Sequence, residues 1–104
     1  MGRIAIACYK PKPGQDEALR ALVAEHVSTL RSIGLTTDRP PVAMQAKDGT
    51  VIEVFEWASP EAIQAAHAHP VVLGMWEEYS RLCDYVPLAT VGEASDLFAE
   101  FAPV

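Results

Sequence analysis

The fold is decided by residues 50–60, which read TVIEVFEWASP. Apart from two glutamates, residues 50–57 are β-branched or aromatic, a composition typical of a strand in a sheet. Ser59 and Pro60 then predict a helix start, because serine caps the first helical amides and proline suits the first helical position. Upstream, Asp48-Gly49 predicts a tight hairpin turn after a short strand over residues 42–47. The stretch therefore predicts a β-hairpin followed directly by a helix.

The residues before this hairpin predict one strand and one long helix. Residues 3–9 are rich in Ile and Ala and end at a loop containing Pro and Gly, as expected for a strand. Apolar residues then recur at three- and four-residue spacing from Leu19 to Ile33, which indicates a helix with one buried face. Gly34 follows the last of them and predicts the end of this helix.

The residues after the hairpin predict a broken helix, a strand and a tail. Pro70 interrupts the second helix, because proline disfavours helical backbone in the residue before it. Residues 85–91 predict a fourth strand, which Pro87 places at an edge of the sheet or at a bulge. Residues 93–104 predict a short C-terminal helical tail with three apolar anchors. The anchors are Leu97, Phe98 and Phe101.

The predicted order of elements is β-α-β-β-α-β, which is the ferredoxin-like arrangement of an α+β domain. It places the helices on one face of a four-stranded antiparallel sheet, in a single domain of residues 1–104. The other face of the sheet retains apolar residues, and an open apolar face favours association. We therefore expect a homodimer in which two sheets pack face to face.

Charge and composition exclude several classes of partner. The chain carries 14 acidic and 8 basic residues, a net charge of -6, and no cluster of Lys and Arg that could neutralise nucleic-acid phosphates or an anionic membrane. The N-terminal residues lack the apolar region of a signal peptide, so we expect a cytoplasmic protein. Its two cysteines, Cys8 and Cys83, lie among apolar neighbours and predict small buried hydrophobes rather than a disulfide framework.

Residues 3–91 resemble the dimeric α+β barrel superfamily, and within it the antibiotic biosynthesis monooxygenase (ABM) type. The resemblance rests on the order of elements and on the acidic-hydrophobic strand that ends in Trp57 and leads into an Ala-rich helix. It implies cofactor-free quinone-forming oxygenases, heme-degrading enzymes, isomerases, or members without known activity. Heme-degrading members have Asn, Trp and a heme-ligating His where this chain has Ala7, Ala66 and Trp76. Heme degradation is therefore disfavoured, and we expect no cofactor.

Two histidines are the candidate catalytic residues. His26 falls at the centre of the apolar face of the first long helix, and His67 lies one turn beyond Ile63 on the second. Both are expected to point into the layer between helices and sheet. An imidazole there could serve as a general base or as a hydrogen-bond donor to a phenolic or enolic substrate near neutral pH. The alternative is that each is a core histidine bonded to a backbone carbonyl or a buried water.

Aromatic and acidic residues complete the predicted site. Three aromatic residues are expected to wall a pocket for a flat substrate, or else to belong to the core. They are Trp57, Trp76 and Tyr79. Glu53 and Glu56 lie on opposite faces of one strand, so one of them is directed inward and needs a cationic or histidine partner, either as an ion pair or as a general base. His67 and His69 are too poorly aligned to form a metal site, and we expect no metal.

These observations lead to one function and two alternatives. We expect a cofactor-independent monooxygenase-like enzyme that acts on a small aromatic or polyketide-like compound. The alternatives are a non-catalytic small-molecule-binding or assembly module, and an isomerase of the muconolactone type with the same fold.

Overall fold

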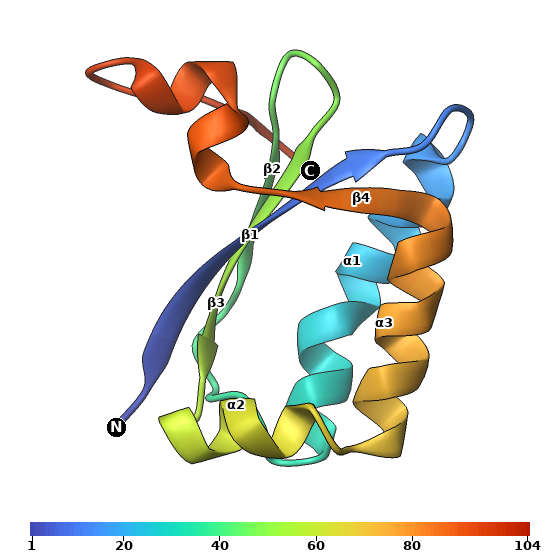
Figure 1. The fold of residues 1–104 in the computed structure, drawn as a ribbon. Helices are drawn as coiled ribbons and strands as arrows, with labels where there is room; N and C mark the ends of the chain where they lie inside the picture. The colour runs from blue at the N-terminus through green and yellow to red at the C-terminus, as the bar shows by residue number, and fades with distance from the viewer.

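The computed structural model describes residues 1–104 and contains one five-stranded antiparallel sheet in the order β4-β1-β3-β2-β5. The helices cover one face of this sheet (Figure 1). The strands are β1 (Arg3–Pro11), β2 (Val42–Gln45), β3 (Val51–Trp57), β4 (Cys83–Val86) and β5 (Ala102–Pro103). The helices are α1 (Asp16–Ser32), α2 (Pro60–Ala66) and α3 (Pro70–Leu82), and two 3₁₀ turns follow β4, η1 (Leu88–Thr90) and η2 (Gly92–Ser95).

The hairpin predicted from residues 50–60 forms the middle of the sheet. Its turn is closed by Asp48, whose Oδ1 accepts a hydrogen bond from the Thr50 amide at 2.9 Å, and Gly49 takes the positive φ of 93° that the turn requires. β3 pairs along its whole length with β1, from Arg3 opposite Trp57 to Tyr9 opposite Val51. The two central strands are therefore fixed in register over seven residue pairs.

The helix boundaries follow the local signals. Ser59 Oγ accepts a hydrogen bond from the Ala62 amide at 3.0 Å, and Pro60 occupies the first turn of α2. The predicted break at Pro70 is confirmed, because α3 begins there. His69 caps α3 by accepting a hydrogen bond from the Val71 amide at 3.2 Å.

The core lies between the helices and one face of the sheet. α1 and α3 run side by side over this face, and α2 closes its lower end (Figure 1). Side chains alternate along a strand, so the odd-numbered residues of β3 point towards the helices. Val51, Phe55 and Trp57 are buried there against apolar residues of the helices. Glu53 occupies the same row and is the one charged residue in it.

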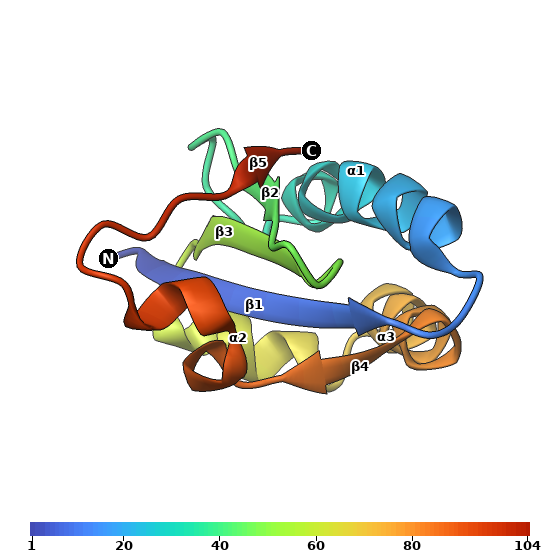
Figure 2. The ribbon, with the colours of Figure 1, turned by 90° about the horizontal axis from the view of Figure 1, so that it is seen from above.

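The prediction of a four-stranded sheet with a helical tail was wrong. Residues after Val91 form the short turn η2 and then an extended segment, and β5 pairs with β2 at the edge of the sheet (Figure 2). A short isolated helix is marginal in water, whereas the edge of β2 offers unpaired backbone groups. Of the three predicted anchors, Leu97 and Phe98 are exposed, and only Phe101 packs, against a cluster that includes Val91.

The fourth strand, β4, covers Cys83–Val86 rather than the predicted residues 85–91. β4 ends at Val86 because Pro87 cannot donate to the ladder and instead leads into η1. Its predicted edge position is confirmed, since β4 pairs only with β1.

The face of the sheet opposite the helices is partly open. Residues 91–101 cover the end near Cys8 and Ile52. The remainder exposes Ile4, Ile6 and Val42, with exposed fractions of 60%, 50% and 54%. An apolar surface therefore remains on the face where the sequence predicts one.

Candidate functional site

The layer between the sheet and the helices contains a cavity of about 370 Å³. This volume lies within the range of roughly 300–1,000 Å³ typical of small-molecule sites. The wall is almost entirely apolar or aromatic and contains no Lys or Arg. The lining residues are Ala5, Ala7, Tyr9, His26, Phe55, Trp57, Trp76, Tyr79 and Tyr85.

The cavity exists because β1 carries small side chains on the face that meets the helices. Ala5 and Ala7 point inward, opposite Phe55 and Glu53 on β3. Alanine leaves open the space that a larger side chain would fill, which explains the gap in an otherwise packed layer.

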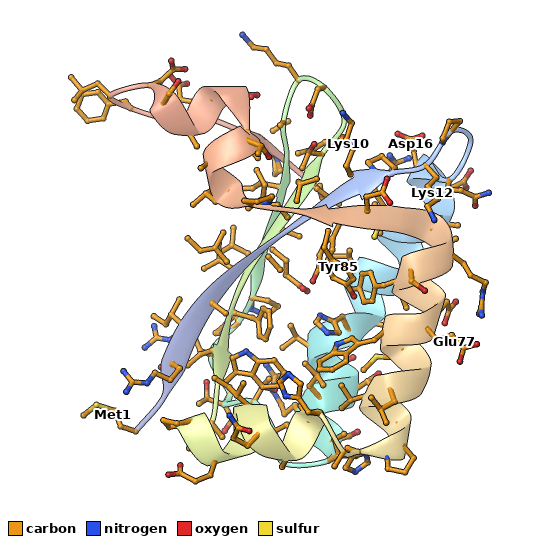
Figure 3. All side chains as sticks on the ribbon, in the orientation of Figure 1. Met1, Lys10, Lys12, Asp16, Glu77 and Tyr85 are labelled. Atoms are coloured by element: carbon orange, nitrogen blue, oxygen red, sulfur yellow. The ribbon has the colours of Figure 1, made fainter.

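The cavity meets the surface beside β4. This strand pairs only with residues 8–11 of β1 and leaves the rest of that edge of β1 without a strand partner. Tyr85 of β4 lines the cavity yet is 54% exposed, so it stands where the wall reaches solvent. Figure 3 shows its side chain below β4, directed towards the space between the sheet and α3. A ligand could enter there.

A buried hydrogen-bonded triad lies at the cavity wall. Nδ1 of His26 is 2.8 Å from Oε1 of Glu53, and the Tyr9 hydroxyl donates to the same oxygen at 2.9 Å. All three side chains are at least 95% buried. A carboxylate only accepts hydrogen bonds, so we assign the imidazole proton to Nδ1, which leaves the lone pair of a neutral ring on Nε2. Glu53 thereby fixes the tautomer and orientation of His26.

Two buried polar atoms of the wall have no partner in the protein. They are Nε2 of His26 and the hydroxyl of Tyr79. Buried polar groups are nearly always hydrogen-bonded, and each exception requires an explanation, such as a catalytic role, a bound water or a ligand. One of these atoms is an acceptor and the other is a donor, and their rings contact each other with centroids 5.2 Å apart.

The tyrosines of the site are kept neutral. Burial, and after it the negative charge of Glu53, raise the pKa of Tyr9 and Tyr79 far above the ordinary range of tyrosine. Burial also raises the pKa of Tyr85 to about 12. All three hydroxyls therefore remain protonated hydrogen-bond donors at physiological pH.

The structure brings together most of the predicted site residues. His26 is buried and directed at the sheet, as predicted, and lines the cavity. Trp57, Trp76 and Tyr79 line the same cavity, while their role in binding substrate stays a prediction. Of the two glutamates, Glu53 is the inward one and has a histidine as its partner.

The predicted inward position of His67 was wrong. α2 ends at Ala66, so His67 is its C-terminal cap rather than part of a continuing helical face. The inward positions of α2 are Ala62 and Ala66, and His67 is exposed. Its Nδ1 donates to the carbonyl of Ile63 at 2.8 Å, and its ring lies against that of Trp76, with centroids 5.2 Å apart.

Sequence reasoning gave no role to Tyr9 and only a minor one to Glu53. A signal for both is present in the alternation of the strands. Tyr9 and Glu53 lie in the two rows that point at the helices, where the other residues are apolar except for Arg3 at the start of β1. Polar groups in an apolar inward row require a buried partner.

The remaining chemistry-bearing groups do not form a second site. No group of three or more His, Cys, Asp or Glu side chains is placed to hold a metal ion. Cys8 and Cys83 are free and buried, and burial raises the pKa of the Cys83 thiol to about 11. No helix has the length and apolar character that crossing a membrane requires.

Comparisons with known proteins define the fold and no more. No family model matches the sequence, and no curated protein matches it. Among solved structures, the chain is similar to that of Rv0793 from Mycobacterium tuberculosis, with 23% identity and a TM-score of 0.64 over 91% of this chain and 100% of that one. The fold and cavity thus define a small α+β protein with an aromatic-walled site, and the likeness to Rv0793 supports the fold.

Proposed function

We propose that this protein is a cofactor-independent enzyme that deprotonates a small phenolic or enolic compound in the aromatic cavity, for oxidation by molecular oxygen. The observation that carries the proposal is the free Nε2 of His26, buried on a cavity-lining ring whose Nδ1 is held by Glu53. The same pairing of imidazole and carboxylate orients the general base of hydrolytic triads.

His26 is the proposed base. Nε2 takes the proton of the substrate hydroxyl, and the resulting imidazolium is stabilised by the Glu53 carboxylate 2.8 Å from Nδ1. Proton transfer by a positioned side chain contributes on the order of 10²–10⁴-fold to rate. Trp57 and Trp76 supply flat apolar walls for the ring of the substrate.

The oxidation step is supported by the resemblance to ABM-type monooxygenases. Deprotonation makes the aromatic compound electron-rich enough to reduce oxygen without a cofactor. In an anthrone-type substrate, one methylene carbon loses two hydrogens and gains one oxygen atom as a carbonyl. The second oxygen atom leaves as water, so no external reductant is consumed.

Two alternatives use the same cavity. An isomerase of the muconolactone type would return the proton to another carbon and would not consume oxygen. A binding module would hold the compound without turnover. The unpartnered Nε2 favours proton transfer over simple binding, because a purely apolar site has no need of an oriented base.

A hydroxyanthrone provides the test. We expect the protein to consume one molecule of oxygen for each molecule of quinone formed, and His26→Gln to lower that rate by about 10²-fold or more. Exchange of the substrate's acidic hydrogens with deuterated solvent under nitrogen, without oxidation in air, would favour the isomerase. Binding with neither reaction would leave the binding module and reject the enzyme.

We also propose that the open face of the sheet joins a second copy of the chain. Ile6, Val54 and Val42 lie directly beside one another across β1, β3 and β2, and Ile6 and Val42 are half exposed. Covering such a row with a second sheet removes apolar surface from water. The site itself lies on the other face, between the sheet and the helices.

A further inference from the structure

We infer that the Tyr79 hydroxyl is a second polar anchor of the cavity, and that the site takes an uncharged flat compound bearing both a hydroxyl and a separate carbonyl oxygen. This inference rests on the proposed function, because the hydroxyl of that compound is the group that faces Nε2 of His26. The carbonyl oxygen accepts a hydrogen bond from Tyr79.

Two stacked tyrosines of the cavity wall differ in the hydrogen bonding of their hydroxyls. The rings of Tyr9 and Tyr79 stack with centroids 4.7 Å apart and planes 23° apart, and both residues line the cavity. The Tyr9 hydroxyl is occupied, since it donates to Glu53 at 2.9 Å. The Tyr79 hydroxyl is fully buried and makes no hydrogen bond of ordinary length, although the neighbouring Tyr9 hydroxyl is near enough to affect its pKa.

This difference assigns different roles to the two residues. Tyr9 acts through Glu53 and is a positioning residue for the base. Tyr79 has a donor without an acceptor in the protein, and leaving a buried hydroxyl unpaired is unfavourable unless a ligand or an ordered water satisfies it. A phenylalanine would have filled the same volume without that penalty. The hydroxyl therefore points to an oxygen acceptor on the ligand.

The charge of the site restricts the ligand further. No Lys or Arg lines the wall, Glu53 lies directly behind it, and the whole chain has a net charge of -6. A carboxylate or phosphate would enter this cavity without a counter-ion, which is strongly unfavourable for a buried charge. A neutral hydroxyl and a neutral carbonyl fit the one free acceptor and the one free buried donor.

The test compares two ligands and two matched variants. The ligands are naphthol, which has only the hydroxyl, and an acetylnaphthol, which adds a carbonyl on another carbon. The variants are Tyr79→Phe and Tyr9→Phe, each of which removes one oxygen atom from a stacked ring. Dissociation constants come from calorimetry, and unfolding midpoints from thermal scans.

We expect Tyr79→Phe to weaken acetylnaphthol binding by roughly five- to tenfold and to leave naphthol binding unchanged. Its unfolding temperature stays the same or rises, because no bond in the free protein is lost. Tyr9→Phe removes the bond to Glu53 and lowers the unfolding temperature by about 4–8 °C. If Tyr79→Phe weakens the binding of acetylnaphthol but not of naphthol, the lost contact is the one between the Tyr79 hydroxyl and the carbonyl. The substitution does not alter the acidity of either ligand.

Three results would overturn the inference. Tyr79→Phe could weaken both ligands equally, it could weaken neither, or it could fail to fold, which would mean that its hydroxyl serves the structure. The proposed function fails separately, if naphthol does not bind the unmodified protein or if His26→Gln oxidises the hydroxyanthrone at the unmodified rate.

Discussion

Nδ1 of His26 on α1 lies 2.8 Å from Oε1 of Glu53 on β3, and both side chains are buried. This contact joins α1 to β3, the central strand of the sheet. It leaves Nε2 of His26 free on the ring that lines the cavity. Apolar packing would stabilise the core at least as well, because a buried polar or ionic pair is often no better than apolar packing.

Two substitutions of Glu53 distinguish the effect of its charge on stability from the effect of the hydrogen bonds that it accepts. Glu53→Gln keeps an oxygen that accepts from Tyr9 and His26, so we expect only a small loss of stability. Glu53→Leu leaves both donors unpaired, at a cost of about 1–3 kcal/mol each in the free energy of unfolding. Urea denaturation of the two variants measures the difference. Equal stability of Glu53→Gln and Glu53→Leu is incompatible with the hydrogen bonds described.

Filling the cavity should abolish binding without unfolding the protein. Ala7→Leu adds side-chain volume where the wall is open, and cavity-filling changes commonly leave stability unchanged or raise it by about 0.5–2 kcal/mol. We expect naphthol affinity to fall at least tenfold. The control is Ile6→Leu, the neighbouring residue on the opposite face of β1, which should bind naphthol normally. Equal affinity of the two variants would place the ligand elsewhere.

The three tyrosines predict a loss of stability in alkali. The ordinary pKa of tyrosine is about 10, whereas that of Tyr85 is raised to about 12 by burial and those of Tyr9 and Tyr79 are raised further. Between these values the unfolded chain has lost protons that the folded chain retains, so the free energy of unfolding falls as pH rises. Stability is therefore complete below about pH 10 and declines as pH approaches and passes 12.

Phenolate absorbance measures this effect directly, because the chain contains only these three tyrosines. At about pH 10 the chain in denaturant should be half ionised, whereas the native protein should show almost no phenolate. The prediction fails if both samples ionise over the same pH range.

A charge on the open sheet face should prevent association. Light scattering should give the unmodified chain twice its mass of 11.3 kDa at micromolar concentration. Ile6→Glu places a carboxylate in the centre of the apolar row and should return the mass to 11.3 kDa with the fold intact. A matched change on the exposed surface of α1, Ala24→Glu, should leave the mass doubled. A single-chain mass for the unmodified protein would refute the pairing.

The sequence predicts the fold well where local signals are strong. The Ser59 cap and the break at Pro70 each follow from the chemistry of one or two residues, and both occur as predicted. The chain also turns at Asp48-Gly49, but the turn includes Lys47, so β2 ends at Gln45 rather than at residue 47 and the loop is longer than the predicted two residues. The tail could not be predicted in this way. Its conformation depends on the edge of β2, which is distant in sequence and becomes available only when the sheet has formed.

The site was predictable only in part, because local signals place some of its residues and contacts between distant residues place the others. Helical periodicity places His26 correctly, because α1 is long and regular. The same reasoning fails for His67, because α2 ends one residue before it. The pairing of His26 with Glu53 depends on how α1 sits over β3, and neither residue alone specifies that contact.

The most direct test of the proposed base is the ionisation of a bound phenol. A nitrophenol is coloured only as the phenolate, so its absorbance reports where the proton lies. At a pH at which the free nitrophenol is mostly neutral, we expect the molecule bound to the unmodified protein to be ionised, with its proton on Nε2 of His26. Bound to His26→Gln it should be neutral. Equal ionisation of the nitrophenol on the two proteins would contradict the assignment of His26 as the base.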